Sequence, residues 1–242
     1  MVRTVTAATA LLLSAAGSLV ACGGTSPAVD RPAAEHATAL RGAPDPPTPR
    51  GDTAGTAPAV ASARRPETSD GRPARARLTI PALGLHDLLV VPYRGRTDDA
   101  PGTRIQDRGA AASPFGPRGG VGPGGLGNYQ VTGHRTSSTH PFADLPSLQL
   151  GARAIVVAKG VRYVYEIRRT RQTSFRSPRS LAEQRAAVPG RPGTRPTHAY
   201  LTLSTCATQE DHAAGNYWSD ALHNPEHRID KIGVLVRAVV AE

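Results

Sequence analysis

The chain is poor in cysteine, aromatic residues and lysine, and each shortage excludes a class of protein. Two cysteines in 242 residues are too few for a disulfide-rich scaffold or a four-cysteine zinc site. Aromatic residues make up 4% of the sequence, so few are available to stack on bases. The net charge of +10 comes from 27 arginines and two lysines scattered along the chain. We attribute this bias to a GC-rich genome and do not expect nucleic acid as a partner.

Residues 22–75 lack aromatic side chains altogether and contain nine of the 22 prolines. Such a segment cannot bury enough apolar surface to offset the entropy of an ordered chain, so we predict a disordered tether rich in proline and alanine. Proline stiffens and extends a tether of this kind. The remaining residues, 76–242, are sufficient for one domain with its own core.

The N-terminus has the pattern of a secretory signal peptide. Arg3 supplies a positive charge, and residues 7–21 form an apolar run that is short for a membrane-spanning helix. Residues 1–21 end in the sequence LVA directly before Cys22, which resembles a bacterial lipobox. The resemblance implies that Cys22 is acylated and anchors a lipoprotein on the extracytoplasmic face of the cell membrane. Cys206 is then the only remaining thiol.

β-Strand patterns dominate residues 76–242. Short apolar and β-branched runs end at proline, glycine or polar residues, and one run alternates as a half-buried strand does. The expected strands are residues 78–80, 88–91, 129–132, 154–158, 161–167, 200–204 and 232–240. We therefore predict a mainly β fold, a closed or nearly closed β-barrel of seven to eight strands with short helices in the connections.

Helical signals are fewer. Ser180 to Glu183 resembles a capping box, so we expect a helix from Ser180 to Ala187, and one short turn within residues 143–149. Residues 116–127 hold seven glycines, but no Gly-Lys-Ser/Thr ending and no following helix. We therefore expect a surface loop there rather than a phosphate-binding loop.

Three residues suited to acyl transfer stand at or near strand ends. His134 follows one expected strand, Cys206 follows another, and Arg228 precedes the last. A thiol needs a base such as imidazole to become a nucleophile, and a guanidinium can bind a substrate carbonyl or an oxyanion. From these residues alone, Cys206 could equally be a small core residue and His134 a loop histidine. His140 has no suitably placed carboxylate or cysteine beside it, so we expect no metal and no cofactor.

The motifs around these residues closely resemble those of the sortase family. Residues 132–135 (TGHR) carry a Gly-His motif, and residues 141–145 (PFADL) follow it as in that family. Residues 201–206 (LTLSTC) match a Thr-Leu-x-Thr-Cys motif, and residues 78–84 (LTIPALG) resemble the family's first strand. The resemblance covers most of residues 76–242 in the right order. It is closest to the class E sortases of actinobacteria.

This resemblance implies a cysteine transpeptidase with Cys206 as nucleophile, His134 as general acid/base and Arg228 as the essential arginine. Thr205 matches the residue before the nucleophile, and the resemblance implies that the backbone or the side chain of this residue helps to bind the oxyanion. The implied enzyme cleaves a C-terminal sorting motif of the LPxTG or LAxTG type after threonine, through a thioester. Its partners would be surface proteins that carry the motif, and an amine acceptor from a peptidoglycan precursor or a pilin lysine.

Two features depart from the class E pattern. Cys206 and Arg228 are separated by a longer segment than is usual there, which could displace Arg228 from the site. A lipobox also stands where class E sortases usually have a transmembrane anchor. Two other functions therefore remain open, a non-catalytic surface module that binds peptides and a cysteine peptidase that releases its acyl group to water.

Overall fold

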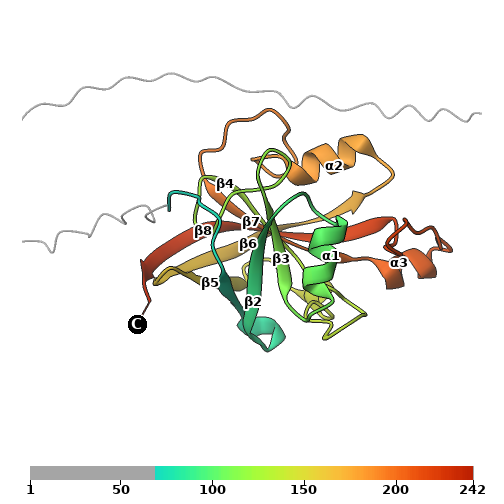
Figure 1. The fold of residues 1–242 in the computed structure, drawn as a ribbon, viewed down its shortest axis with the longest axis horizontal. Helices are drawn as coiled ribbons and strands as arrows, with labels where there is room; N and C mark the ends of the chain where they lie inside the picture. Colours follow the sequence, from blue (N-terminus) through green and yellow to red (C-terminus); the bar gives the residue numbers. More distant parts are fainter. Residues whose placement is uncertain (1–68, 242) are drawn as a thin grey trace, which may run out of the picture. The chain divides into compact units, whose positions relative to one another are not determined.

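Residues 69–241 are described by a computed structural model, in which eight strands close into a barrel (Figure 1). The order around the barrel is β1-β2-β3-β4-β7-β8-β6-β5. This confirms the mainly β barrel expected from the sequence. The predicted signal peptide, the lipobox with Cys22 and most of the predicted tether lie outside the described residues. The strands are β1 (Ala76–Ile80), β2 (Leu85–Arg94), β3 (Ala111–Phe115), β4 (Gly127–Thr132), β5 (Arg153–Ala158), β6 (Val161–Ser174), β7 (Ala199–Cys206) and β8 (His227–Val240).

Three α-helices and two 3-10 turns occupy the connections. They are α1 (Ala100–Gln106), α2 (Pro178–Arg185), α3 (Thr208–Ala213), η1 (Pro81–Leu83) and η2 (Leu145–Ser147). The turn expected within residues 143–149 is η2. Within residues 69–241, no helix is long and apolar enough to cross a membrane.

Helix α2 begins earlier than the sequence indicates. Its N-cap is Ser177, whose side chain accepts a hydrogen bond from the Ser180 amide, and Pro178 occupies the first turn. Proline suits that position because its missing N–H would have no partner there and its φ is already helical. The hydroxyl of Ser180 instead accepts from the Ser174 amide at 3.0 Å. The expected capping box at Ser180 is therefore wrong, and the helix ends at Arg185.

Strand β2 continues through Pro92, where the sequence predicted its end. Pairing with β1 reaches only Val90, so β2 has a strand partner on one side alone when it passes Pro92. Proline has no N–H to donate to a neighbouring strand, so it is tolerated where a strand lacks a partner on one side. The partner of β2 on its other side is β3, a parallel strand that the sequence did not predict. Apart from Phe115, the residues of β3 (AASPF) are small, and they lack the run of large apolar or β-branched side chains that indicates a strand.

The barrel buries side chains on both of its surfaces near β4, β7 and β8. Leu201 and Leu203 point into the hydrophobic interior. The outer surface carries polar residues, and α2 covers them: Gln184 donates to Asp230 at 3.0 Å and to Ser204 at 3.3 Å. This outer surface, rather than the interior, leads to the strand ends that carry the candidate site.

The glycine-rich connection between β3 and β4 is exposed at residues 116–118, as expected for a surface loop, but it is buried at residues 122–125. A Cβ on Gly122 would lie 2.0 Å from the carbonyl oxygen of Arg72, so only glycine fits this close approach. The Gly122 amide donates to Gly71 at 2.7 Å, and the Ser69 amide donates to Gly124 at 3.1 Å. Residues 69–72, which the sequence assigns to the tether, therefore lie against the barrel.

Candidate active site

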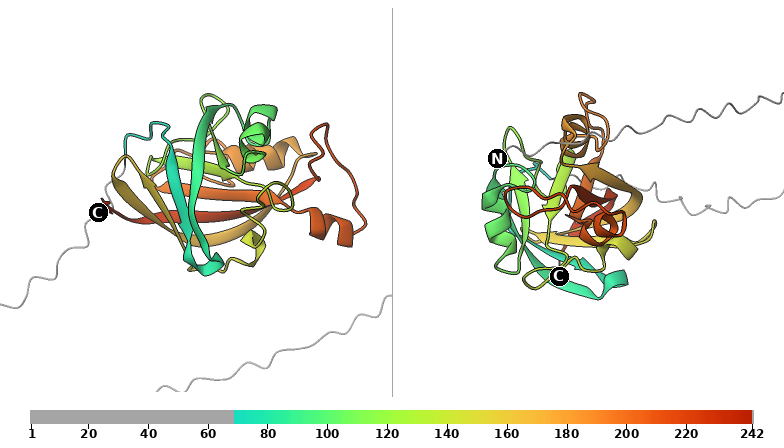
Figure 2. Two further views of the ribbon diagram at one scale, coloured as in Figure 1. Left: turned by 60° about the horizontal axis from the view of Figure 1, so that its bottom comes forward. Right: turned by 90° about the vertical axis from the view of Figure 1, so that its right-hand side faces the viewer.

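The structure brings His134, Cys206 and Arg228 to the same end of the barrel on three neighbouring strands. Thr132 and Ser204 are register partners on the parallel strands β4 and β7. His134 and Cys206, each two residues further, therefore leave neighbouring strands at the same level. Cys206 is in turn the direct register partner of Arg228 on β8. This is the end that carries α3, away from the C-terminus (Figure 2).

The long segment between Cys206 and Arg228 is folded, and it does not separate the two residues. It contains α3, whose buried Asp211 accepts from the His227 amide at 3.0 Å and contacts its Nδ1 at 2.6 Å. These two contacts bring the end of the segment back beside its start. Arg228 therefore enters β8 opposite Cys206, and the displacement considered from the sequence does not occur.

His134 contacts a carboxylate that the sequence did not indicate. Its Nε2 lies 2.9 Å from Oδ1 of Asp107, at the end of α1. An ionised carboxylate only accepts hydrogen bonds, so Nε2 carries the hydrogen in this contact. In the neutral imidazole, Nδ1 is then the nitrogen left to take a proton. The His134 side chain is 12% exposed, so it is held in place yet open to a reactant.

Cys206 ends strand β7 and is partly exposed. Desolvation by the surrounding protein raises the pKa of its thiol, Asp98 raises it further, and Arg228 opposes both by favouring the thiolate. The thiol is therefore the form present at neutral pH, and a base must remove its proton before it can attack. The strand register brings the backbone of His134 to the level of Cys206, so its imidazole is the candidate base.

Arg228 is almost completely buried, with 1% of its surface exposed. Its Nη1 donates to the carbonyl oxygens of Pro225 at 2.8 Å and His227 at 3.1 Å. Its guanidinium lies over the ring of Phe175 at 4.2 Å, and Nε lies 3.4 Å from Oδ1 of Asp98. Burial lowers the pKa of Arg228, but Asp98 and Cys206 raise it more, so the group keeps its charge.

Arg135 links the histidine side of the site to the cysteine side. It is 7% exposed and forms a two-pronged ion pair with Glu210 on α3, of which one contact is 3.0 Å. It also donates to Oε1 of Gln209 at 2.9 Å and to the carbonyl oxygen of Cys206 at 3.3 Å. Paired guanidinium–carboxylate bonds fix geometry as well as adding energy. Arg135, the residue next to His134, therefore holds α3 and the end of β7 in place.

Thr205 is buried, and its hydroxyl donates to the carbonyl oxygen of Gly133 at 2.8 Å. The hydrogen of this hydroxyl is thus used within the protein, and the contact fixes the residue before His134. Any bond from Thr205 to an oxyanion, as the family resemblance implies, would have to come from its backbone.

Sequence reasoning missed Asp98, Asp107 and Glu210. Each belongs to a segment whose position beside the site is set by the barrel and not by any local pattern. Arg135 was visible as part of the TGHR motif, but its partner on α3 was not.

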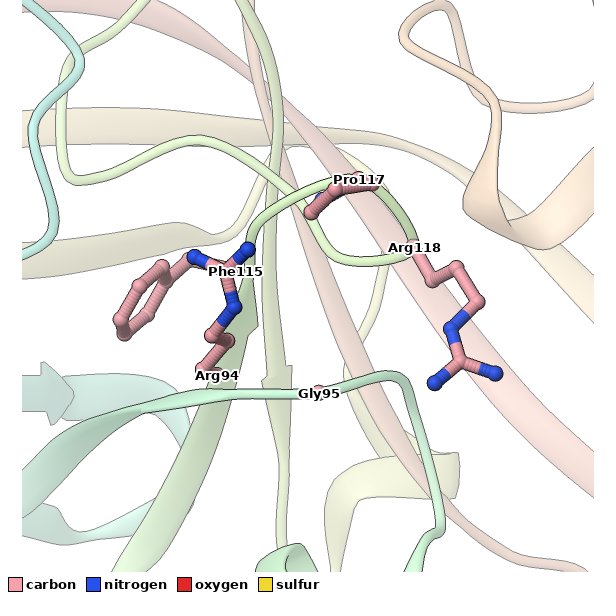
Figure 3. A pocket seen from close by; sticks show the side chains of 5 residues that line it. All are labelled: Arg94, Gly95, Phe115, Pro117 and Arg118. Atoms are coloured by element: carbon pink, nitrogen blue, oxygen red, sulfur yellow. The ribbon is translucent and has the colours of Figure 1, made fainter.

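A separate hollow of about 320 Å³ lies between the ends of β2 and β3 (Figure 3). It is lined by Arg94, Gly95, Phe115, Pro117 and Arg118. None of these residues was predicted to act in catalysis, and the loop from Pro117 to Arg118 forms one rim of the hollow.

A closed eight-stranded barrel with a cysteine, a histidine and an arginine on adjacent strand ends defines a sortase-like site. The family model described as "Sortase domain" matches residues 78–221. The chain therefore belongs to the sortase family. No curated protein sequence matches it.

Solved structures of sortases share this fold. The SrtA sortase from Actinomyces oris aligns with a TM-score of 0.52 and 19% identity, covering 74% of this chain and 89% of that one. Sortase E from Streptomyces avermitilis aligns with a TM-score of 0.50 and 22% identity, covering 71% and 93%. Sortase E1 from Streptomyces coelicolor, solved with a tripeptide in its active site, gives 0.50 and 21%, covering 72% and 94%. At these identities the likeness establishes the fold.

Proposed function

We propose that this sortase-family protein is a transpeptidase that cleaves a C-terminal sorting motif and joins the new carboxyl end to an amine. The observation that carries the proposal is the register of β4, β7 and β8, which aligns a base, a thiol and a guanidinium. The same register argues against a purely peptide-binding module, because that alternative rested on Arg228 lying far from Cys206.

In the first half of the reaction, His134 takes the proton of Cys206 and the sulfur attacks the threonine carbonyl of the motif. A carbon–sulfur bond forms, and the carbonyl oxygen becomes an oxyanion beside Arg228. When the oxyanion collapses, the carbon–nitrogen bond breaks and the protonated His134 gives its proton to the leaving amine. The product of this half-reaction is a thioester on Cys206.

In the second half, an amine attacks the thioester, His134 accepts its proton, and the carbon–sulfur bond breaks as the new amide forms. The thiolate regains a proton from His134. If water attacks instead, the same steps give hydrolysis, so the two activities differ only in the acceptor. The motif we propose is of the LPxTG or LAxTG type, carried by surface proteins. The acceptor amine we propose belongs to a peptidoglycan precursor or a pilin lysine.

The decisive experiment incubates the protein with a labelled LAxTG peptide, with and without an excess of a glycine-based amine. Mass spectrometry should detect an acyl adduct on the wild-type protein, and the Cys206→Ala variant should form none. Ligation products should appear when the amine is added. An adduct on the Cys206→Ala variant would disprove the proposal, and hydrolysis that the amine never diverts would favour the peptidase.

We also propose that the protein is a lipoprotein, held outside the cell membrane through Cys22. The support is the lipobox-like sequence before Cys22, which lies outside the described residues. A Cys22→Ser variant should move from the membrane fraction to the soluble fraction, whereas a Cys206→Ser variant should not. If Cys22→Ser remains in the membrane fraction, another anchor holds the protein.

A further inference from the structure

Three protein oxygens face the Arg228 guanidinium, two at Nη1 and one at Nε, and none faces Nη2. Both hydrogens of Nη1 are directed at the carbonyl oxygens of Pro225 and His227. Nε faces Oδ1 of Asp98 at 3.4 Å. Nε and Nη2 are both buried and without a hydrogen-bond partner among residues 69–241, and only Nε has a carboxylate facing it. Nη2 is therefore the donor that we assign to an incoming oxygen.

Asp98 is held in an unusual backbone conformation between two anchored neighbours. Its φ is 56°, in the left-handed region that aspartate and asparagine tolerate better than most residues. The hydroxyl of Thr97 donates to Gln184 at 3.0 Å and accepts from Arg185 at 3.0 Å. Asp99 on the other side accepts from the Gly102 amide at 3.1 Å as the N-cap of α1.

The carboxylate of Asp98 and the guanidinium of Arg228 depend on each other. The Asp98 side chain is 8% exposed, and its Oδ2 is buried with no partner in the described part of the chain. A buried charge is costly unless an opposite charge lies close, and Arg228 supplies that charge here. The protein thus maintains a strained backbone and a poorly bonded carboxylate at the one position that faces Nε of Arg228.

We propose that Asp98 is a positioning residue for the reaction, which holds the Nε edge of Arg228 so that Nη2 faces the oxyanion formed at Cys206. This proposal rests on the transpeptidase function proposed above. Asp98 touches no reacting atom. It acts on the transition state through Arg228, and its loss should therefore lower kcat more than it changes KM.

The test is Asp98→Asn, which keeps the shape of the side chain and its tolerance of the left-handed backbone but removes the charge. We expect kcat for motif cleavage to fall on the order of 10- to 100-fold, as for a misplaced catalytic group, with KM nearly unchanged. The matched control is Asp87→Asn. Asp87 has the same backbone conformation, with a φ of 54°, and the same 3.4 Å separation from an arginine, Arg77, but it is exposed. This control should keep wild-type kcat.

A second measurement needs no turnover. In ¹H–¹⁵N spectra of arginine side chains, the Nε–H signal of Arg228 should shift and exchange faster with water in Asp98→Asn, and stay unchanged in Asp87→Asn. Asp98→Gly, which also accepts the positive φ, repeats the test if the asparagine variant unfolds. Wild-type kcat together with an unchanged Arg228 signal would overturn the proposal. A wild-type protein that forms no thioester would overturn the proposed function instead, and the spectra would still test the role of Asp98.

Discussion

Cys206 and Arg228 are direct register partners on the antiparallel strands β7 and β8, although a whole helix and a turn lie between them in the sequence. Their closeness is set by the backbone ladder and is supported by the contacts of Asp211 with His227. Changes to exposed residues of that segment should leave the pairing intact, whereas changes to the charges packed around Arg228 should not.

Removing the Arg228 charge should destabilise the fold as well as abolish activity. Arg228→Met leaves Asp98 buried without its counter-charge, which we expect to cost about 3 kcal/mol in the free energy of unfolding. The double variant Arg228→Met/Asp98→Asn should recover most of this loss and remain inactive. Urea unfolding and peptide cleavage measure the two effects. Equal stability of the single and double variants would show that the two charges do not interact.

The ion pair between Arg135 and Glu210 should support both stability and activity. Arg135→Lys cannot make the two-pronged contact or keep the bond to the Cys206 carbonyl, so we expect a loss of roughly 1–3 kcal/mol and slower thioester formation. Glu210→Gln keeps an acceptor and should lose less. A double-mutant cycle in urea gives the coupling between the two residues. A coupling near zero would contradict the structural role given to this pair.

The hydroxyl of Thr205 should matter through Gly133. Thr205→Val keeps the shape of the side chain but leaves the Gly133 carbonyl without this donor, at a cost of about 1–3 kcal/mol. Because Gly133 precedes His134, turnover should fall as well. Thr205→Ser retains the hydroxyl and should behave like the wild type. If valine and serine give the same turnover, the contact does not position His134.

The reactivity of Cys206 should depend on pH in a way that its charged neighbours control. Burial and Asp98 raise the pKa of the thiol, so alkylation by iodoacetamide should have a midpoint above the ordinary value of a cysteine. Asp98→Asn removes a negative charge and should lower this midpoint. Arg228→Met removes the cation that favours the thiolate and should raise it. Movement of the midpoint in the opposite direction in either variant would contradict this electrostatic account.

Asp230 should make stability depend on pH in the acidic range. Burial raises the pKa of its carboxyl in the folded protein, and bonds from Ser204, Thr173 and Gln184 only partly oppose this. A raised folded pKa favours the protonated, folded form. Its contribution is fully present below the unfolded pKa and is lost as the pH rises through the folded pKa. The Tm of the wild type relative to Asp230→Asn should therefore increase as the pH falls from 7. A constant difference across that range would contradict the assignment.

The sequence could predict the barrel because most strands carry apolar or alternating runs that bury one face. It could not predict β3, whose small residues are buried only because neighbouring elements cover them. His134, Cys206 and Arg228 could be chosen from their chemistry and motifs. Asp98 could not, because its role comes from a loop that tertiary packing brings to Arg228 from a distant part of the chain. Local sequence patterns indicate which residues are buried and where the chain turns, but they do not indicate which charged side chains come into contact in the folded protein.

The contacts of residues 69–72 with the glycine-rich connection determine where the chain can be shortened. A fragment that begins at residue 76 would remove the carbonyl of Gly71 that the Gly122 amide bonds, and the Ser69 amide that bonds Gly124. It would also expose the backbone of Gly122, which packs so closely against residues 69–72 that only glycine fits there. A recombinant sortase domain should therefore begin at or before Ser69, several residues ahead of the first strand.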